Sequence, residues 1–217
     1  MKKEKKLLIL GVLLCFAFAI WTVLIQTADV KPAGQNGTYI GFASFNLWFF
    51  KLCGVHMTLY IITDWLGLAA IAVCMIFGAL GFVQMIKRKS LLKVDYDIRL
   101  LGIYYIIVIF CYLIFEMIPI NYRPILIDGR MEASYPSSTT LLVLSVMPTL
   151  VFQANRRLKN ICKKRAVVGF SVLFSAFMVT GRLVCGVHWF TDIFAGILLS
   201  GGLFTIYMSL VLLNDKK

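Results

Sequence analysis

The stretch from Leu66 to Lys89, LGLAAIAVCMIFGALGFVQMIKRK, is an apolar run that ends in three consecutive basic residues. Its apolar part, up to Ile86, has about the 20 residues that a helix needs to cross the hydrocarbon core of a bilayer. Basic residues next to such a run mark its cytoplasmic end. We therefore expect a membrane-spanning helix here, and its cytoplasmic end fixes the direction of the other apolar runs.

The whole chain has the composition of a membrane protein. Of its 217 residues 60% are hydrophobic, and the mean hydropathy is +0.87, whereas soluble domains are about half apolar. Six apolar runs are predicted to span the membrane: 7–25, 66–86, 98–118, 139–154, 166–184 and 189–213. The fourth run holds Pro148, so we expect a kink or a tilt there. The predicted fold is an all-α integral membrane protein, a single domain of residues 1–217 with six transmembrane helices in a compact bundle.

The basic residues predict the orientation of this bundle. The net charge of +12 suggests nucleic acid as a partner, but the Lys and Arg residues fall in short clusters between the apolar runs, which argues against one. Seventeen of the 22 lie on one side: Lys2, Lys3, Lys5, Lys6, Lys87, Arg88, Lys89, Lys93, Arg99, Arg156, Arg157, Lys159, Lys163, Lys164, Arg165, Lys216 and Lys217. This side is predicted to be cytoplasmic, with both termini on it.

Polar residues gather at the opposite boundary, between the fifth and sixth runs. The junction TGRLVCGVHWFTDIFAG, Thr180 to Gly196, contains Arg182, His188 and Asp192. On a helix that begins near His188, His188 and Asp192 share a face. An Asp that accepts the Nδ1 proton of a His leaves Nε2 able to react. The alternative is that His188 anchors the helix at the interface and Asp192 caps it.

The loop before the fourth run adds anion-binding groups at the same boundary. Arg123 stands before Pro124 on a rigid turn, and a guanidinium suits phosphate oxygens. Ser137, Ser138 and Thr139 open the fourth run, where a helix N-terminus offers unpaired amides to an anion. An interfacial Arg and an ordinary Ser cap are the alternatives. Two arginines, a helix N-terminus and a His–Asp pair on one outer surface favour a phosphate site.

These residues resemble the three motifs of the type 2 phosphatidic acid phosphatase superfamily, the lipid phosphate phosphatases. The family motifs are Lys-x6-Arg-Pro, Pro-Ser-Gly-His and Ser-Arg-x5-His-x3-Asp. Arg123-Pro124 matches the end of the first motif, and Pro136-Ser137 matches the start of the second. Arg182, His188 and Asp192 match the third motif at full spacing. The motif order, the six spans and the outward-facing site agree with the family as well.

The resemblance implies a mechanism for the site. His188 would attack phosphorus and form a phosphohistidine, with Asp192 orienting it. Arg123, Arg182, Ser137 and the backbone amides of Ser138 and Thr139 would stabilise the phosphate oxygens. The family chemistry requires no metal and no cofactor, and the six cysteines of the chain have no metal-ligand spacing.

Three positions depart from the family motifs. Glu116 stands at the Lys position of the first motif, where it would repel phosphate unless an arginine such as Arg130 paired with it. Gly181 replaces the Ser of the third motif. Thr139 replaces the His that protonates the leaving oxygen in the family. His56, at the outer boundary before the second run, is a conceivable replacement acid, although an ordinary loop His is the simpler interpretation.

The loss of the acid predicts a preference among substrates. An alcohol that leaves unprotonated departs as an alkoxide, comparable to hydroxide from water with a pKa of about 16. A phosphate leaving group has a pKa near 6 and departs as an anion. A general acid typically raises the reaction rate by roughly 100- to 10,000-fold. Its replacement by Thr139 should therefore slow diphosphate cleavage far less than monophosphate cleavage.

The predicted protein is therefore a phosphatase of membrane lipids that acts on the outer leaflet and prefers diphosphates. The short, Lys-rich chain with tight loops favours a bacterial cell membrane, and undecaprenyl diphosphate is the substrate that family analogy suggests. The alternatives are a non-catalytic relative that binds lipid phosphate headgroups, a lipid phosphotransferase, and a small transporter.

Overall fold

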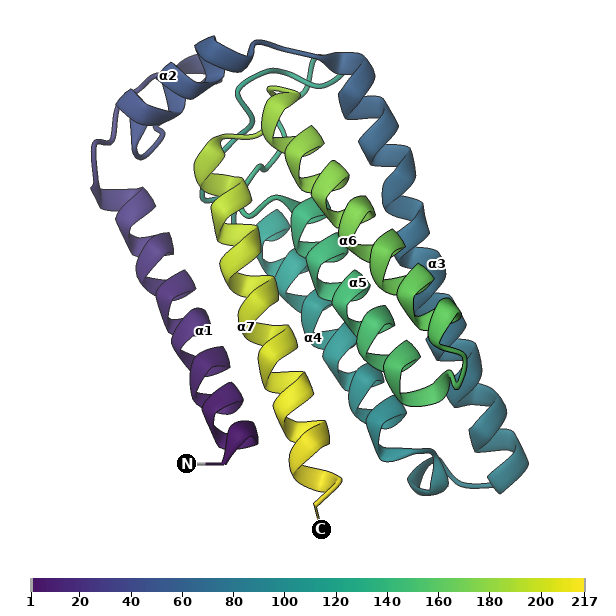
Figure 1. Cartoon of the computed structure of the whole chain (residues 1–217). Coiled ribbons are helices and arrows are strands. Elements are labelled where there is room, and N and C mark those ends of the chain that lie inside the picture. The colour runs from purple at the N-terminus through teal and green to yellow at the C-terminus, as the bar shows by residue number, and fades with distance from the viewer. Residues whose placement is uncertain (1, 217) are drawn as a thin grey trace.

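The computed structural model describes residues 2–216, and this part of the chain is helical without strands (Figure 1). Its α-helices are α1 (Lys3–Thr27), α2 (Ala43–Cys53), α3 (Met57–Arg88), α4 (Tyr96–Met117), α5 (Ser138–Arg157), α6 (Ile161–Val184) and α7 (Phe190–Asn214). All except α2 are long and apolar enough to cross a membrane. The all-α membrane fold and the six spans are thus confirmed. Lys217, one of the basic residues counted above, lies outside the described part.

The helices extend beyond the apolar runs that predicted them. α3 begins at Met57, more than two turns before Leu66, and continues through Thr63 and Asp64. α6 begins at Ile161, so that Lys163 and its basic neighbours lie within its first turns. The helices continue beyond the apolar residues because charged side chains are tolerated where a helix extends into the headgroup region. α5 likewise runs unbroken through Pro148.

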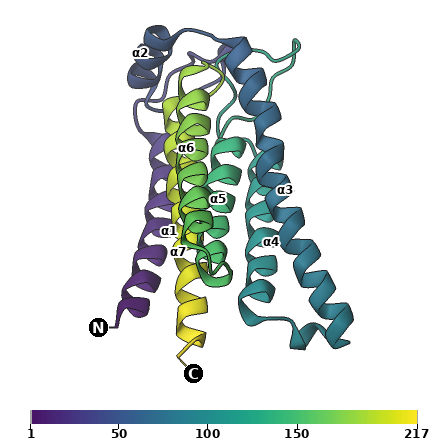
Figure 2. The same ribbon diagram turned by 45° about the vertical axis from the view of Figure 1, so that its right-hand side comes forward.

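The bundle is built around α5 and α7. α1 packs along α7, while α3 packs against α4, α5 and α6 on the flank away from α1 (Figure 2). α1 and α7 meet through small residues: a Cβ atom on Gly202 would lie 2.6 Å from the Cys15 Sγ and 3.1 Å from the Gly11 carbonyl oxygen. Such close approach of backbones is typical of helix pairs inside membranes.

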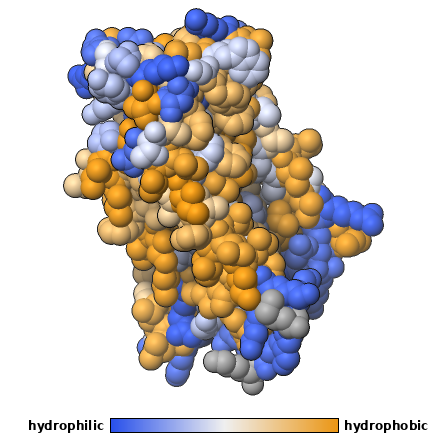
Figure 3. Space-filling view, turned by 90° about the vertical axis from the view of Figure 1, so that its left-hand side faces the viewer, coloured by the Kyte–Doolittle hydropathy of each residue, from blue (hydrophilic) through white to orange (hydrophobic). Residues whose placement is uncertain are grey.

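The outer surface is that of a protein surrounded by lipid. Apolar side chains dominate the middle of the molecule, and hydrophilic side chains concentrate toward its two ends (Figure 3). Large hydrophobic residues such as Phe16, Met75 and Leu173 are well exposed on the helices. At one end α2 also exposes Trp48 and Leu52, which suits a short helix lying at the membrane interface.

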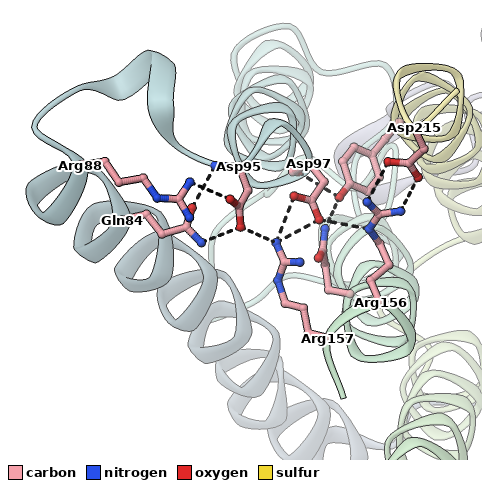
Figure 4. Close-up of polar contacts among 9 residues, drawn as sticks. Gln84, Arg88, Asp95, Asp97, Arg156, Arg157 and Asp215 are labelled. Carbon is pink, nitrogen blue, oxygen red and sulfur yellow. Dashed lines mark hydrogen bonds and ion pairs between the residues drawn. The ribbon is translucent and has the colours of Figure 1, made fainter. Parts of the chain in front are cut away.

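The end that carries both termini is held by a network of charged residues (Figures 1 and 4). Asp97 of α4 is buried and accepts hydrogen bonds from Arg156 and Arg157 of α5 at 3.2 and 3.0 Å. Arg156 also forms a bidentate pair with Asp215 at the end of α7. Arg88 of α3 pairs with Asp95, and this pairing lowers the pKa of the Asp95 carboxyl. Four helices are therefore tied together at this end.

Candidate functional site

The candidate site lies at the opposite end, under the loop between α4 and α5. This loop folds back on itself as a short hairpin, because the Arg123 amide donates to the Glu132 carbonyl and the Ser134 amide donates to the Asn121 carbonyl. The hairpin is attached to α7 at two points. The Trp189 indole donates to the Tyr122 carbonyl at 2.8 Å, and the Ser137 amide donates to the Asp192 carbonyl at 3.1 Å. The first and third predicted motifs are thereby brought together.

A cavity of about 350 Å³ lies against this hairpin. Arg123 and His188 line it together with Ser138 at the start of α5. Carboxylates line it as well: Asp64 from α3, Glu116 from α4 and Glu132 from the hairpin. The cavity thus combines a cation, an imidazole and a helix N-terminus with acidic groups around them.

The His188 imidazole is buried and held in one tautomer. Its Nδ1 lies 3.1 Å from the Ser134 carbonyl oxygen and 3.9 Å from the Asp192 carboxylate. Because a carbonyl oxygen can only accept, Nδ1 carries the proton and Nε2 keeps its lone pair. Nε2 is buried without a hydrogen-bond partner among the described residues. Ser134, which sequence reasoning missed, therefore orients the ring more directly than Asp192 does.

The surroundings of His188 also keep it neutral. Burial lowers its pKa to about 4, against the opposing influence of the Asp192 carboxylate. The charges of Arg123 and Arg182 lower the pKa further. A neutral imidazole with an unpaired Nε2 in a cavity is able to act as a nucleophile.

Asp192 links α7 to the hairpin. Its carboxylate is fully buried and accepts from the Trp189 amide at 3.0 Å and from the Asn121 side chain at 3.1 Å. It therefore caps α7, the alternative considered from sequence, and it also places a negative charge near His188. α7 begins at Phe190, so His188 precedes the helix instead of sharing a helical face with Asp192. Asn121 lies two residues before Arg123, and nothing in the sequence pattern singled it out.

The two arginines occupy different depths. Arg123 lines the cavity with its Nε 3.0 Å from the Glu132 carboxylate, and its Nη1 has no partner among the described residues. Arg182 is buried behind the cavity, where its Nη2 donates to Asp64 at 2.8 Å and to the Thr139 hydroxyl. Both guanidinium groups lie over the Tyr60 ring, at 5.6 and 4.7 Å from its centroid. The ring holds the two cations near one another by cation–π attraction.

The hydroxyls at the N-terminus of α5 make different contacts. Ser137 is the N-cap, and its buried hydroxyl accepts from the Thr140 amide. The amides of Ser138 and Thr139 lie in the first turn, where no intrahelical acceptor exists. Ser138 lines the cavity, whereas the Thr139 hydroxyl is occupied by Arg182.

Two auxiliary residues lie away from the cavity. The His56 Nε2 lies 2.9 Å from the Cys53 carbonyl, and His56 is not among the residues that line the cavity. Arg130 is exposed at the tip of the hairpin and forms no ion pair with Glu116 within residues 2–216. Glu116 itself lines the cavity, and the carboxylate that approaches an arginine is that of Glu132.

A second, largely apolar cavity of about 520 Å³ adjoins the first. It lies between α3, α4 and α5 and includes Leu68, Ile71 and Val108. The two cavities share four lining residues: Asp64, Tyr112, Ser138 and Leu141. A polar chamber joined to an apolar one fits a ligand with a charged head and a hydrocarbon tail.

Two comparisons with known proteins found a match, one with a family model and one with a solved structure. The family model of the PAP2 superfamily matches residues 118–216, which include the motif residues from Arg123 to Asp192. Among solved structures, the chain resembles the crystal structure of the first transmembrane PAP2 type phosphatidylglycerolphosphate phosphatase from Bacillus subtilis, with a TM-score of 0.64. The match has 18% sequence identity and covers 95% of this chain and 97% of that one, so it shows a shared fold. No curated protein matches the chain.

Proposed function

We propose that the chain is a member of the PAP2 superfamily and a membrane lipid phosphatase that cleaves a lipid phosphate or diphosphate through a phosphohistidine; the family model that matches residues 118–216 and the shared fold support this. The observation that carries the proposal is the buried, neutral His188 with an unpaired Nε2 in a cavity that also contains Arg123 and the start of α5. A nucleophile, a cation and unpaired backbone amides around one small chamber are what phosphoryl transfer requires.

In this mechanism the His188 Nε2 attacks phosphorus while the bond to the leaving oxygen breaks. The Nδ1 proton stays on the ring, and the Ser134 carbonyl and the Asp192 carboxylate stabilise the positive charge that develops there. Arg123 and the amides of Ser138 and Thr139 bind the equatorial oxygens. Water then attacks the phosphohistidine and restores the imidazole.

The substrate follows from the two cavities. The phosphate occupies the polar cavity, and the hydrocarbon chain lies in the apolar cavity between α3, α4 and α5. Thr139 offers no proton to the leaving oxygen, which favours a diphosphate, whose leaving group departs as an anion. Undecaprenyl diphosphate, a long-chain diphosphate of bacterial membranes, is the proposed physiological substrate. The site faces the outside of the cell, opposite the end that carries the basic clusters and the termini.

Phosphate release from purified protein in detergent tests this function. We expect lipid diphosphate to be hydrolysed much faster than phosphatidic acid, and His188→Ala to lose both activities to background. His56→Ala is the matched control, because the second histidine of the chain lies outside the cavity and its loss should leave the rate unchanged. Equal rates on the two lipids would refute the diphosphate preference.

A non-catalytic lipid phosphate binder is the second candidate, favoured by Glu116 and Thr139 at two motif positions. Binding of labelled lipid diphosphate without release of phosphate by the wild-type protein would identify it. A phosphotransferase would be recognised in the same assay, since an added alcohol would then appear as a phosphate ester.

A further inference from the structure

The structure offers a replacement for the acid that Thr139 does not supply. The Thr139 hydroxyl accepts a hydrogen bond from Arg182, and a hydroxyl is too weak an acid to protonate an alkoxide efficiently. We propose that Asp64 of α3 is the general acid and base of the reaction. This inference rests on the proposed phosphatase function.

The position of Asp64 is the first argument. Asp64 Oδ1 and Thr139 Oγ1 both accept from the same nitrogen, Arg182 Nη2, which places the two oxygens within about 5 Å of each other. The carboxylate therefore lies beside the residue that stands at the motif position of the family acid, although it comes from a different helix. No sequence spacing connects the two positions, which are 75 residues apart.

The second argument is that Asp64 lines both cavities. The oxygen that leaves phosphorus connects the phosphate in the polar cavity to the chain in the apolar one, so it has to lie where the two cavities meet. Glu116 and Glu132 line the polar cavity but not the apolar one. Among the carboxylates around the site, Asp64 is the one placed at the leaving oxygen.

A bound phosphate supplies the proton that Asp64 needs. Asp64 lines the polar cavity, and a carboxylate beside a phosphate dianion would place two like charges together. The last proton of a phosphate monoester, with a pKa near 6, is therefore shared with the carboxylate. The phosphate monoanion in effect brings the proton that Asp64 returns to the leaving oxygen.

The proton then follows a closed path. As the bond between Nε2 and phosphorus forms and the P–O bond breaks, the Asp64 carboxyl gives its proton to the leaving oxygen, and the alcohol departs. In the second step the Asp64 carboxylate takes a proton from water while the water oxygen attacks phosphorus and the N–P bond breaks. Inorganic phosphate, neutral His188 and protonated Asp64 result, and release of that proton restores the ion pair with Arg182.

This role is compatible with the diphosphate preference. A departing phosphate needs no proton, so diphosphates remain the faster substrates, while Asp64 makes the cleavage of monophosphates possible. The contribution of Asp64 should consequently depend on the leaving group. A residue that served to position Arg182 alone would affect all substrates alike.

The test compares three substrates in wild type and Asp64→Asn: phosphatidic acid, a lipid diphosphate and p-nitrophenyl phosphate, whose aryl leaving group needs little protonation. Asp64→Asn should lose about 100- to 10,000-fold on phosphatidic acid and less than about tenfold on the other two. Equal losses on all three substrates, or none, would overturn the role. A wild-type protein that hydrolyses none of them would instead refute the proposed function.

The readout is a ratio of rates, which does not depend on how much of a variant is folded. Glu116→Gln is the matched control, because it neutralises a carboxylate that lines the polar cavity alone and should leave the ratio as in wild type. Asp64→Glu keeps an acid and should retain most of the wild-type ratio. In the Asp64→Asn background, Thr139→His should raise the phosphatidic acid rate again. If Asp64→Glu loses the wild-type ratio and the double variant also fails to raise this rate, the proposal is contradicted.

Discussion

His188 owes its properties to what its two ring nitrogens contact. Nδ1 contacts the Ser134 carbonyl, and Nε2 is buried without a partner among the described residues. The same burial that leaves Nε2 unpaired disfavours the charged ring and lowers the pKa of His188 to about 4. Burial is therefore the common cause of the unpaired Nε2 and of the neutral state of His188.

The lowered pKa predicts a pH dependence of stability. An unfolded His has a pKa near 6.5, so between pH 6.5 and about 4 the unfolded chain binds a proton that folded His188 does not. The stability from this residue is complete above pH 6.5 and decreases as the pH falls toward 4, by roughly 3 kcal/mol in all. In thermal unfolding, the difference between wild type and His188→Gln should be constant above pH 7 and shift against wild type below 6.5. A difference independent of pH would contradict the buried, neutral ring.

Single residues differ in how well the sequence predicted them. Motif spacing predicted Arg123, His188 and Asp192 as site residues, and the structure brings them to one end of the bundle. The contacts of Asn121 and Ser134, and the proposed role of Asp64, depend on segments far apart in the chain. Spacing along one element cannot reveal such contacts.

The pairing of α1 with α7 depends on the absence of side chains at Gly11 and Gly202. Since a Cβ on Gly202 would meet backbone atoms of α1 at 3.0 and 3.1 Å, Gly202→Ala should push the helices apart. The expected cost is about 1–3 kcal/mol, seen as a lower unfolding temperature in detergent. Gly169→Ala in α6 is the control, because its Cβ would meet nothing within 4 Å and alanine favours a helix. Equal behaviour of the two variants would argue against this helix contact.

Long elements were predicted better than short ones. Each of the six apolar runs corresponds to a helix, because length and composition suffice to recognise a span. α2 was not predicted, since its 11 residues are too few for a span and its apolar side chains lie on the surface. The hairpin between α4 and α5 was also not predicted, because its backbone pairing has no alternating apolar pattern to indicate it.

The two ends of the molecule differ in how their charged side chains are paired. Ion pairs of Asp95, Asp97 and Asp215 with arginines tie α3, α4, α5 and α7 together at the end of the termini. The other end keeps buried polar atoms of His188, Arg123 and Arg182 without partners among the described residues. Ion pairs between helices at one end and unpaired polar atoms around a cavity at the other are consistent with a base that supports a binding site.

The orientation of these ends in the membrane is the prediction that belongs to the whole molecule. The basic clusters predict that the end of the termini lies in the cytoplasm, with the loop before α2 outside the cell and Cys162, at the start of α6, inside it. In an otherwise cysteine-free chain, Tyr39→Cys, at a well exposed position, should react with a membrane-impermeant maleimide on intact cells. A chain that keeps Cys162 alone should react after the cells are permeabilised, since this cysteine is exposed at the other end. The reverse pattern would place the His188 cavity on the cytoplasmic leaflet, and the outward-facing lipid diphosphate proposed above would then be out of its reach.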